Sequence, residues 1–155
     1  MSTTELAIYT ATVRSPNSDH PHGWACVIKD NDDVIRSEFK PAADWEDIEL
    51  LAVGTALRSL ADAGRTNTKL AIYFASRRTP MLFTGTYEFD TATGGDRTRK
   101  LVARCQTLMD QIGGPDHPAT INTVLDSFNP ANRLVRTEWR KAYGGGFRPR
   151  KVTAV

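Results

Sequence analysis

Hydrophobic and polar positions change their spacing several times along the chain, and each change marks an expected element. Three early segments, residues 5–13, 23–29 and 34–39, carry the short apolar patterns of β-strands. The polar turn Asp30-Asn31-Asp32-Asp33 lies between the second and third segments. We therefore expect these strands to form an antiparallel meander.

A long helix is expected after the meander. Asp44 is followed three positions later by Asp47, a spacing that resembles a capping box. Apolar residues then recur from Ile48 to Leu60 on a wide face, which favours a helix packed on a sheet. Gly64 is expected to end this helix.

The second half of the chain alternates between strand and helix patterns. Residues 69–74 form a nearly continuous apolar run, typical of a buried strand reached by a helical crossover. The remaining expected elements are a short helix over 76–83, a loop over 84–95, an amphipathic helix over 99–112, a strand over 119–125 and a helix over 130–143. This order predicts an α/β domain with a mixed five-stranded sheet, three antiparallel strands followed by parallel strands, flanked by helices.

Composition adds a charge asymmetry to this picture. The 155 residues are 40% apolar, enough for one domain with a buried core, and the net charge is only +2. Yet residues 129–155 hold seven basic residues against one acid. We expect a folded domain over 1–143 and a flexible basic tail over 144–155, with the basic end facing a polyanion or serving solubility.

Cysteine and hydropathy patterns indicate the compartment. Cys26 and Cys105 lie in apolar patterns without CxxC spacing, which favours buried free thiols in a reducing environment. No apolar run has the length of a membrane span, and the first residues lack a signal-peptide pattern, so we expect a cytoplasmic protein without membrane contact.

Histidines and tryptophans give weaker signals. His20 and His22 lie near Asp19 in a proline-containing loop, which is more typical of an ordinary loop than of a metal site. The three tryptophans, Trp24, Trp45 and Trp139, are expected to anchor packing.

Three short motifs resemble those of the ribonuclease H family. They are Tyr9-Thr10-Ala11 after the first strand pattern, Ile48-Glu49-Leu50 at the first helix, and Phe74-Ala75-Ser76 after the fourth strand pattern. The resemblance implies aspartate at the positions of Ala11 and Ala75, and it matches Glu49 to the family's helix glutamate. Residues 129–136 resemble the family's last motif, with Asn129 in place of a mobile histidine and Arg136 in place of a fourth acid.

The resemblance implies hydrolysis of RNA–DNA hybrids by two magnesium ions, which several converging carboxylates would hold. Only Glu49 remains of the four acids, and Arg136 brings the opposite charge. We therefore expect an ion pair between Arg136 and Glu49 in the space of a metal. No metal is expected to bind, and magnesium enters only if the protein is an active nuclease.

The leading hypothesis is a catalytically degenerate domain that binds an RNA–DNA hybrid or another duplex without cleaving it. Arg77 and Arg78 follow the fourth strand, at the sheet edge where open α/β sheets bind ligands. Further candidates for phosphate contacts are the helical stripe Arg133, Arg136 and Arg140 and the tail residues Arg148, Arg150 and Lys151.

Two alternatives stay open. The first is a protein-interaction or homo-oligomerisation module on the same fold. The second is an active ribonuclease H, present as a variant inactivated at Ala11 and Ala75 or supplied with a carboxylate by Asp126 or Glu138.

Overall fold

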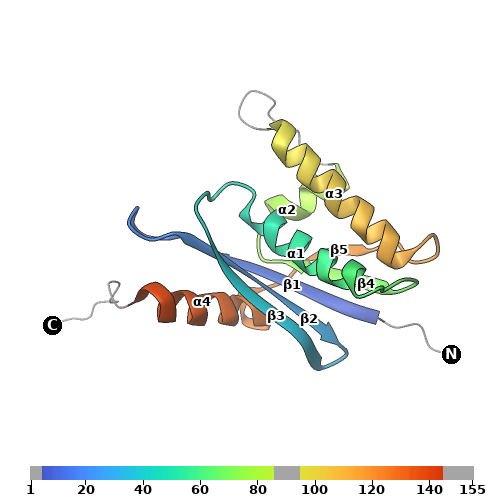
Figure 1. Ribbon diagram of the computed structural model, residues 1–155, viewed down its shortest axis with the longest axis horizontal. Helices are drawn as coiled ribbons and strands as arrows, with labels where there is room; N and C mark the ends of the chain where they lie inside the picture. Colours follow the sequence, from blue (N-terminus) through green and yellow to red (C-terminus); the bar gives the residue numbers. More distant parts are fainter. Residues whose placement is uncertain (1–4, 86–94, 145–155) are drawn as a thin grey trace.

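The computed structural model describes residues 5–85 and 95–144. A mixed five-stranded sheet with the order β3-β2-β1-β4-β5 forms its centre (Figure 1). The strands are β1 (Glu5–Val13), β2 (His22–Asp30), β3 (Asp33–Ala42), β4 (Lys69–Phe74) and β5 (Thr120–Thr123). β1, β2 and β3 pair antiparallel, whereas β4 runs parallel to β1 and to β5. The predicted α/β fold class is confirmed.

The helices follow the predicted order with changed bounds at some ends. They are α1 (Ile48–Asp62), α2 (Arg78–Thr84), α3 (Gly95–Gly113), the 3-10 helix η1 (Asp126–Phe128) and α4 (Pro130–Tyr143). α4 has the predicted bounds, whereas α3 begins before the predicted residue 99 and β5 is shorter than the predicted strand. Most of the loop expected over 84–95 and of the tail expected over 144–155 lies outside the described residues.

The expected capping box at Asp44 is wrong. α1 begins at Ile48, and Asp47 is its N-cap residue with a left-handed backbone, φ 59°. The Asp47 side chain makes no capping hydrogen bond to α1. The C-terminal prediction is confirmed, because Gly64 has φ 79° and its N–H donates to the carbonyl oxygen of Ala61.

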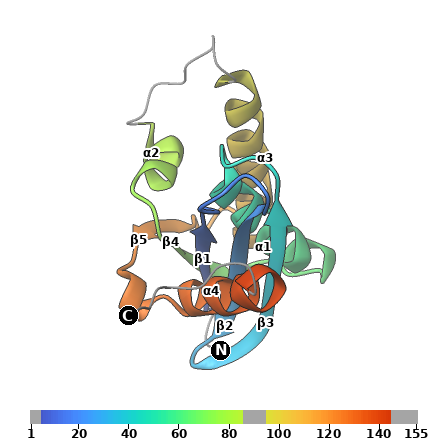
Figure 2. The same cartoon turned by 90° about the vertical axis from the view of Figure 1, so that its left-hand side faces the viewer.

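The two faces of the sheet are covered differently (Figure 2). α1 packs on one face over β1 and β2, and α3 packs against α1, so that this side holds the main core. α4 lies on the opposite face over β1 and β2 with a smaller apolar cluster. Trp24 and Trp139 are buried, and Trp139 Nε1 donates to the carbonyl oxygen of Pro21 at 2.8 Å, which confirms them as packing anchors.

The cysteines are buried free thiols, as the sequence predicts. Burial raises the pKa of Cys26 to about 12 and that of Cys105 to about 11, so both are protonated at neutral pH. Within residues 5–85 and 95–144, no helix has the length and apolarity needed to span a membrane.

Candidate functional site

Glu49 forms the polar centre of the region that the sequence motifs single out. It lies in the first turn of α1 and is only 4% exposed. Its Oε2 accepts hydrogen bonds from Thr10 Oγ1 at 2.8 Å and from the Ala75 N–H at 2.7 Å. Its Oε1 accepts from Ser76 Oγ at 2.6 Å and, over a longer 3.4 Å, from the Ser76 N–H. One carboxylate thus joins α1 to β1 and to the segment that follows β4.

Ser76 extends this network into α2. Ser76 Oγ lies 2.9 Å from Thr79 Oγ1 and accepts from the Thr79 N–H at 3.3 Å. The side chains that hold Glu49 are therefore themselves held, and the carboxylate has a defined orientation. It lies at the carboxyl end of a strand, where open α/β sheets bind ligands.

Asp47 is a second buried carboxylate that the sequence did not reveal as such. Its Oδ2 accepts from Thr98 Oγ1 in α3 at 2.7 Å, and its Oδ1 lies 3.5 Å from the Arg78 guanidinium. The side chain of Asp47 is 0% exposed. Asp47 therefore connects the start of α1 to α2 and α3. Its buried carboxylate pairs with Arg78, whose side chain is 40% exposed.

The side chains of the two alanines contact the small apolar cluster under α4. Ala11 is 0% exposed and belongs to the small cluster under α4, together with Ala25, Val27, Ala131 and Val135. Ala75 is partly buried against the same cluster. At Ala11 the sheet face under α4, opposite the face that α1 and Glu49 cover, is therefore filled by apolar side chains.

The expected ion pair between Arg136 and Glu49 is wrong. Arg136 is exposed on α4, and its Nε donates to Asn132 Oδ1 at 3.2 Å. Val135, one position earlier, is the residue that faces the sheet. Because successive helical residues point about 100° apart, Arg136 is directed away from the interface that Val135 fills. The carboxylate of Glu49 is held by hydroxyl and amide groups instead.

Asn129, at the position matched to a mobile histidine, is part of the fold. It is 3% exposed, and its Oδ1 accepts from the Ala131 N–H at 3.0 Å, which caps the start of α4. Its Nδ2 donates to the carbonyl oxygen of Thr10 at 2.9 Å. Asn129 thus fixes α4 to β1 just before Ala11.

The stripe predicted on α4 is exposed and lines hollows on the protein surface. One hollow of about 300 Å³, the arginine hollow, lies between α4 and the end of β1. Its lining residues are Thr12, Val13, Arg14, Pro16, Arg136, Trp139 and Arg140. No carboxylate residue lines it, whereas three arginines do, and the Arg14 guanidinium carbon lies 5.4 Å from the centroid of the Trp45 ring. Arg14 was missed in the sequence because a single basic residue after a strand has no distinguishing pattern.

The remaining residues predicted to contact phosphate do not form one group within the described residues. Arg77 is exposed at the start of α2, on the edge of the sheet near Ser76. Arg133 is exposed on α4 and lines a second hollow beside η1. The tail residues Arg148, Arg150 and Lys151 lie outside the described residues. The structure therefore brings Arg136 and Arg140 together with Arg14 but places Arg77 on another element.

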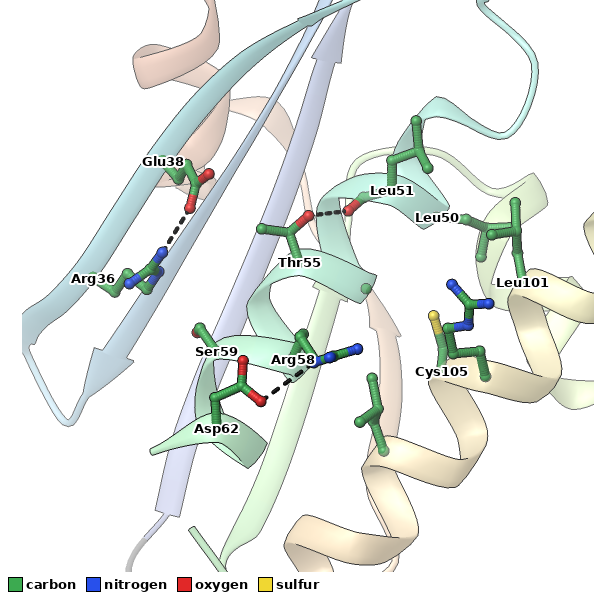
Figure 3. A pocket seen from close by; sticks show the side chains of 13 residues that line it. Arg36, Glu38, Leu50, Leu51, Thr55, Arg58, Ser59, Asp62, Leu101 and Cys105 are labelled. Atoms are coloured by element: carbon green, nitrogen blue, oxygen red, sulfur yellow. Dashed lines mark hydrogen bonds and ion pairs between the residues drawn. The ribbon is translucent and has the colours of Figure 1, made fainter. Parts of the chain in front are cut away.

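A third hollow lies on the other side of the molecule. Figure 3 shows it over α1, between β3 and α3, with Leu51, Leu101 and Cys105 among its apolar lining residues. Its charged groups are largely compensated, because Arg36 pairs with Glu38 at 2.8 Å and Arg58 pairs with Asp62 at 3.2 Å. This groove has three arginines against two acids, a smaller excess of cations than in the arginine hollow, which has three arginines and no acid.

Among the residues that the structure describes, the side chains around Glu49 do not supply the ligands of a centre of two magnesium ions. Within residues 5–85 and 95–144, no three His, Cys, Asp or Glu side chains gather closely enough to hold a metal. Asp126 is exposed in η1, and Glu138 pairs with Lys141 at 3.2 Å. His22 Nδ1 accepts from the Ser15 N–H, and His20 packs against aromatic rings.

Together, the mixed sheet and the covering helices define this chain as an α/β protein with the ribonuclease H fold. No protein-family model matches the sequence, and no curated protein matches it significantly. The similarity is to solved structures and lies in the fold.

Three solved structures illustrate the similarity. The N-terminal RNase H domain of a Mycobacterium tuberculosis protein has a TM-score of 0.71 at 17% identity, with 92% of this chain and 99% of that chain covered. LC11-RNase H1 in complex with an RNA/DNA hybrid gives 0.69 at 20% identity, covering 88% and 98%. RNase H1 of Halobacterium salinarum gives 0.64 at 19% identity, covering 91% and 99%.

Proposed function

We propose that this protein binds nucleic acid, an RNA–DNA hybrid or another duplex, without cleaving it by two-metal chemistry. The observation that carries the proposal is that the protein's own hydrogen bonds occupy the Glu49 carboxylate. Both of its oxygens accept hydrogen bonds from the protein, and the matched neighbouring positions are Ala11, Ala75 and an outward-directed Arg136. Hard divalent ions need several oxygen ligands, and one satisfied carboxylate does not supply them.

The arginine hollow supports the proposed binding of nucleic acid. Arg14, Arg136 and Arg140 line one hollow that has no carboxylate, and within the described residues none of the three forms an ion pair with an acid. A hollow lined by cationic residues and by no acid favours a bound anion. Guanidinium groups match phosphate oxygens in geometry as well as in charge.

The position of the arginine hollow also supports nucleic acid as the partner. Thr12 and Val13, which line it, directly follow Ala11, the position that the resemblance matches to the family's first aspartate. A phosphate held there would place a nucleic-acid backbone at the same end of β1. The similar LC11-RNase H1 has been solved with an RNA/DNA hybrid, which favours the hybrid as the first ligand to test.

Removing two of these charges is expected to weaken hybrid binding. The double variant Arg14→Gln/Arg140→Gln should bind a fluorescent RNA–DNA hybrid at least about tenfold more weakly in fluorescence anisotropy at low salt, because charge-assisted hydrogen bonds to phosphate are lost. The slope of log affinity against log salt should become shallower by about 2, one for each lost contact.

The matched control is Arg58→Gln/Arg104→Gln, which removes the same charge from exposed positions on the other side of the molecule. It should leave both the affinity and the salt slope close to those of the unmodified protein. Equal weakening in both double variants would contradict the assignment to the arginine hollow. An unmodified protein without affinity for hybrid or duplex at low salt would refute the proposal and favour a protein-interaction module.

A further inference from the structure

The second hollow on the α4 side differs from the arginine hollow in having an exposed aromatic ring, Phe128, whereas Trp139 of the arginine hollow is buried. This η1 hollow has a volume of about 700 Å³, within the usual size range of small-molecule sites. It lies between η1, the first turns of α4 and the end of β2. Its lining residues are Lys29, Asp126, Ser127, Phe128, Asn129, Pro130, Asn132, Arg133 and Arg136.

Cations dominate the charge of the η1 hollow. Lys29, Arg133 and Arg136 line it against a single acid, Asp126. Within residues 5–85 and 95–144, none of these three cations pairs with a carboxylate, and Arg136 donates only to the neutral Asn132. The hollow therefore has a net positive charge that a phosphate group would offset.

Phe128 supplies an exposed aromatic ring at the same place. It is 71% exposed, which is unusual for a large apolar side chain, and it lines the hollow. The adjoining sheet surface is aromatic too, because the Lys29 ammonium lies 5.9 Å from the Tyr9 ring centroid and Tyr9 stacks on Tyr73 at 4.9 Å. Aromatic rings beside cations are the combination that binds a base together with its phosphate.

We propose that the η1 hollow binds an unpaired nucleotide of a single-stranded segment, with its base on Phe128 and its phosphate between Lys29 and Arg133. A ring in this position can stack only on a base whose face is free, and the faces of bases within a duplex are covered by their neighbours. The inference rests on the proposed function for its ligand class. It adds a second contact, for single strands, through Lys29, Phe128 and Arg133, which do not line the arginine hollow, although Arg136 lines both hollows.

The test compares a blunt hybrid with the same hybrid carrying a short single-stranded overhang that contains 2-aminopurine. The unmodified protein should bind the overhang substrate about tenfold more tightly than the blunt one, a typical gain for one base stacked on an aromatic ring. The 2-aminopurine fluorescence should be quenched on binding. Phe128→Ala and Phe128→Leu should abolish both effects, and Phe128→Trp should retain them.

Leu125→Ala is the matched control. Leu125 is 70% exposed in the same segment but does not line the hollow, so its removal should change neither affinity nor quenching. Thermal unfolding of all four variants checks that the fold is intact, as expected for exposed positions.

Three outcomes would overturn the inference. If Phe128→Ala keeps the tenfold gain while the blunt hybrid still binds, the inference fails and the proposed function stands. If free nucleoside monophosphate binds as tightly as the overhang and depends on Phe128, the hollow is a site for free nucleotides. If neither substrate binds, the proposed function fails and this inference fails with it.

Discussion

Replacing Glu49 with alanine is expected to lower the free energy of unfolding by about 3 kcal/mol. The substitution leaves the hydroxyl groups of Thr10 and Ser76 and the N–H of Ala75 without their acceptor. Each buried donor that loses its partner costs about 1–3 kcal/mol, and the cost is higher where the lost partner was charged. Ser76 is only partly buried, so water can replace part of its lost hydrogen bond. We therefore expect a total loss of stability near the lower end of the summed range.

Chemical denaturation followed by circular dichroism measures this loss. The control is Glu46→Ala, an exposed acid just before α1, which should change stability by less than about 0.5 kcal/mol. Thr10→Val should reproduce part of the loss, because it removes one donor from the same carboxylate. Unchanged or increased stability of Glu49→Ala would contradict a structural role, since residues kept for a ligand often cost stability.

Introducing an aspartate at position 11 is expected to destabilise the protein by about 3 kcal/mol or more at neutral pH. Ala11 is completely buried, and its neighbours Ala25, Val27 and Val135 offer no hydrogen-bond partner through their side chains. Burial disfavours the charged form of a carboxyl group, so the introduced aspartate would be forced toward protonation.

The destabilisation expected for Ala11→Asp depends on pH. The penalty is largest where the unfolded chain carries a charged aspartate, and it shrinks as the pH falls toward about 4, the ordinary pKa of aspartate. The difference in melting temperature between Ala11→Asp and the unmodified protein should therefore narrow in acid. Ala43→Asp, at an exposed position, is the control and should be nearly neutral. An Ala11→Asp protein of full stability would show that this interface is not tightly packed.

The sequence predicted most of the fold because local signals and the final structure agree. α4 begins and ends as predicted, since Asn129 and Pro130 are a strong start signal and buried Ala131, Val135 and Trp139 recur at helical spacing. The expected capping box at Asp44 is wrong because a tertiary contact holds the side chain of Asp47. The side chain of Asp47 accepts a hydrogen bond from Thr98 in a distant helix, and no local pattern reveals that partner.

The site was predicted less completely than the fold. The motifs located Glu49 and the two alanines but gave no information on hydrogen-bond partners. The expected pairing of Arg136 with Glu49 neglected the direction of side chains, although the spacing of Ala131 and Val135 already implies that Arg136 faces outward. Arg14 and Lys29 were missed because their roles depend on which segments come together in space.

The claim that Glu49 stabilises a binding scaffold and does not serve catalysis is tested most directly by a cleavage assay. The purified protein is incubated with an RNA–DNA hybrid labelled on its RNA strand, in millimolar Mg²⁺ or Mn²⁺, beside a folded Glu49→Gln variant. We predict that the hybrid is bound and the RNA stays at full length with both proteins. Metal-dependent cleavage by the unmodified protein that disappears in Glu49→Gln would contradict the account.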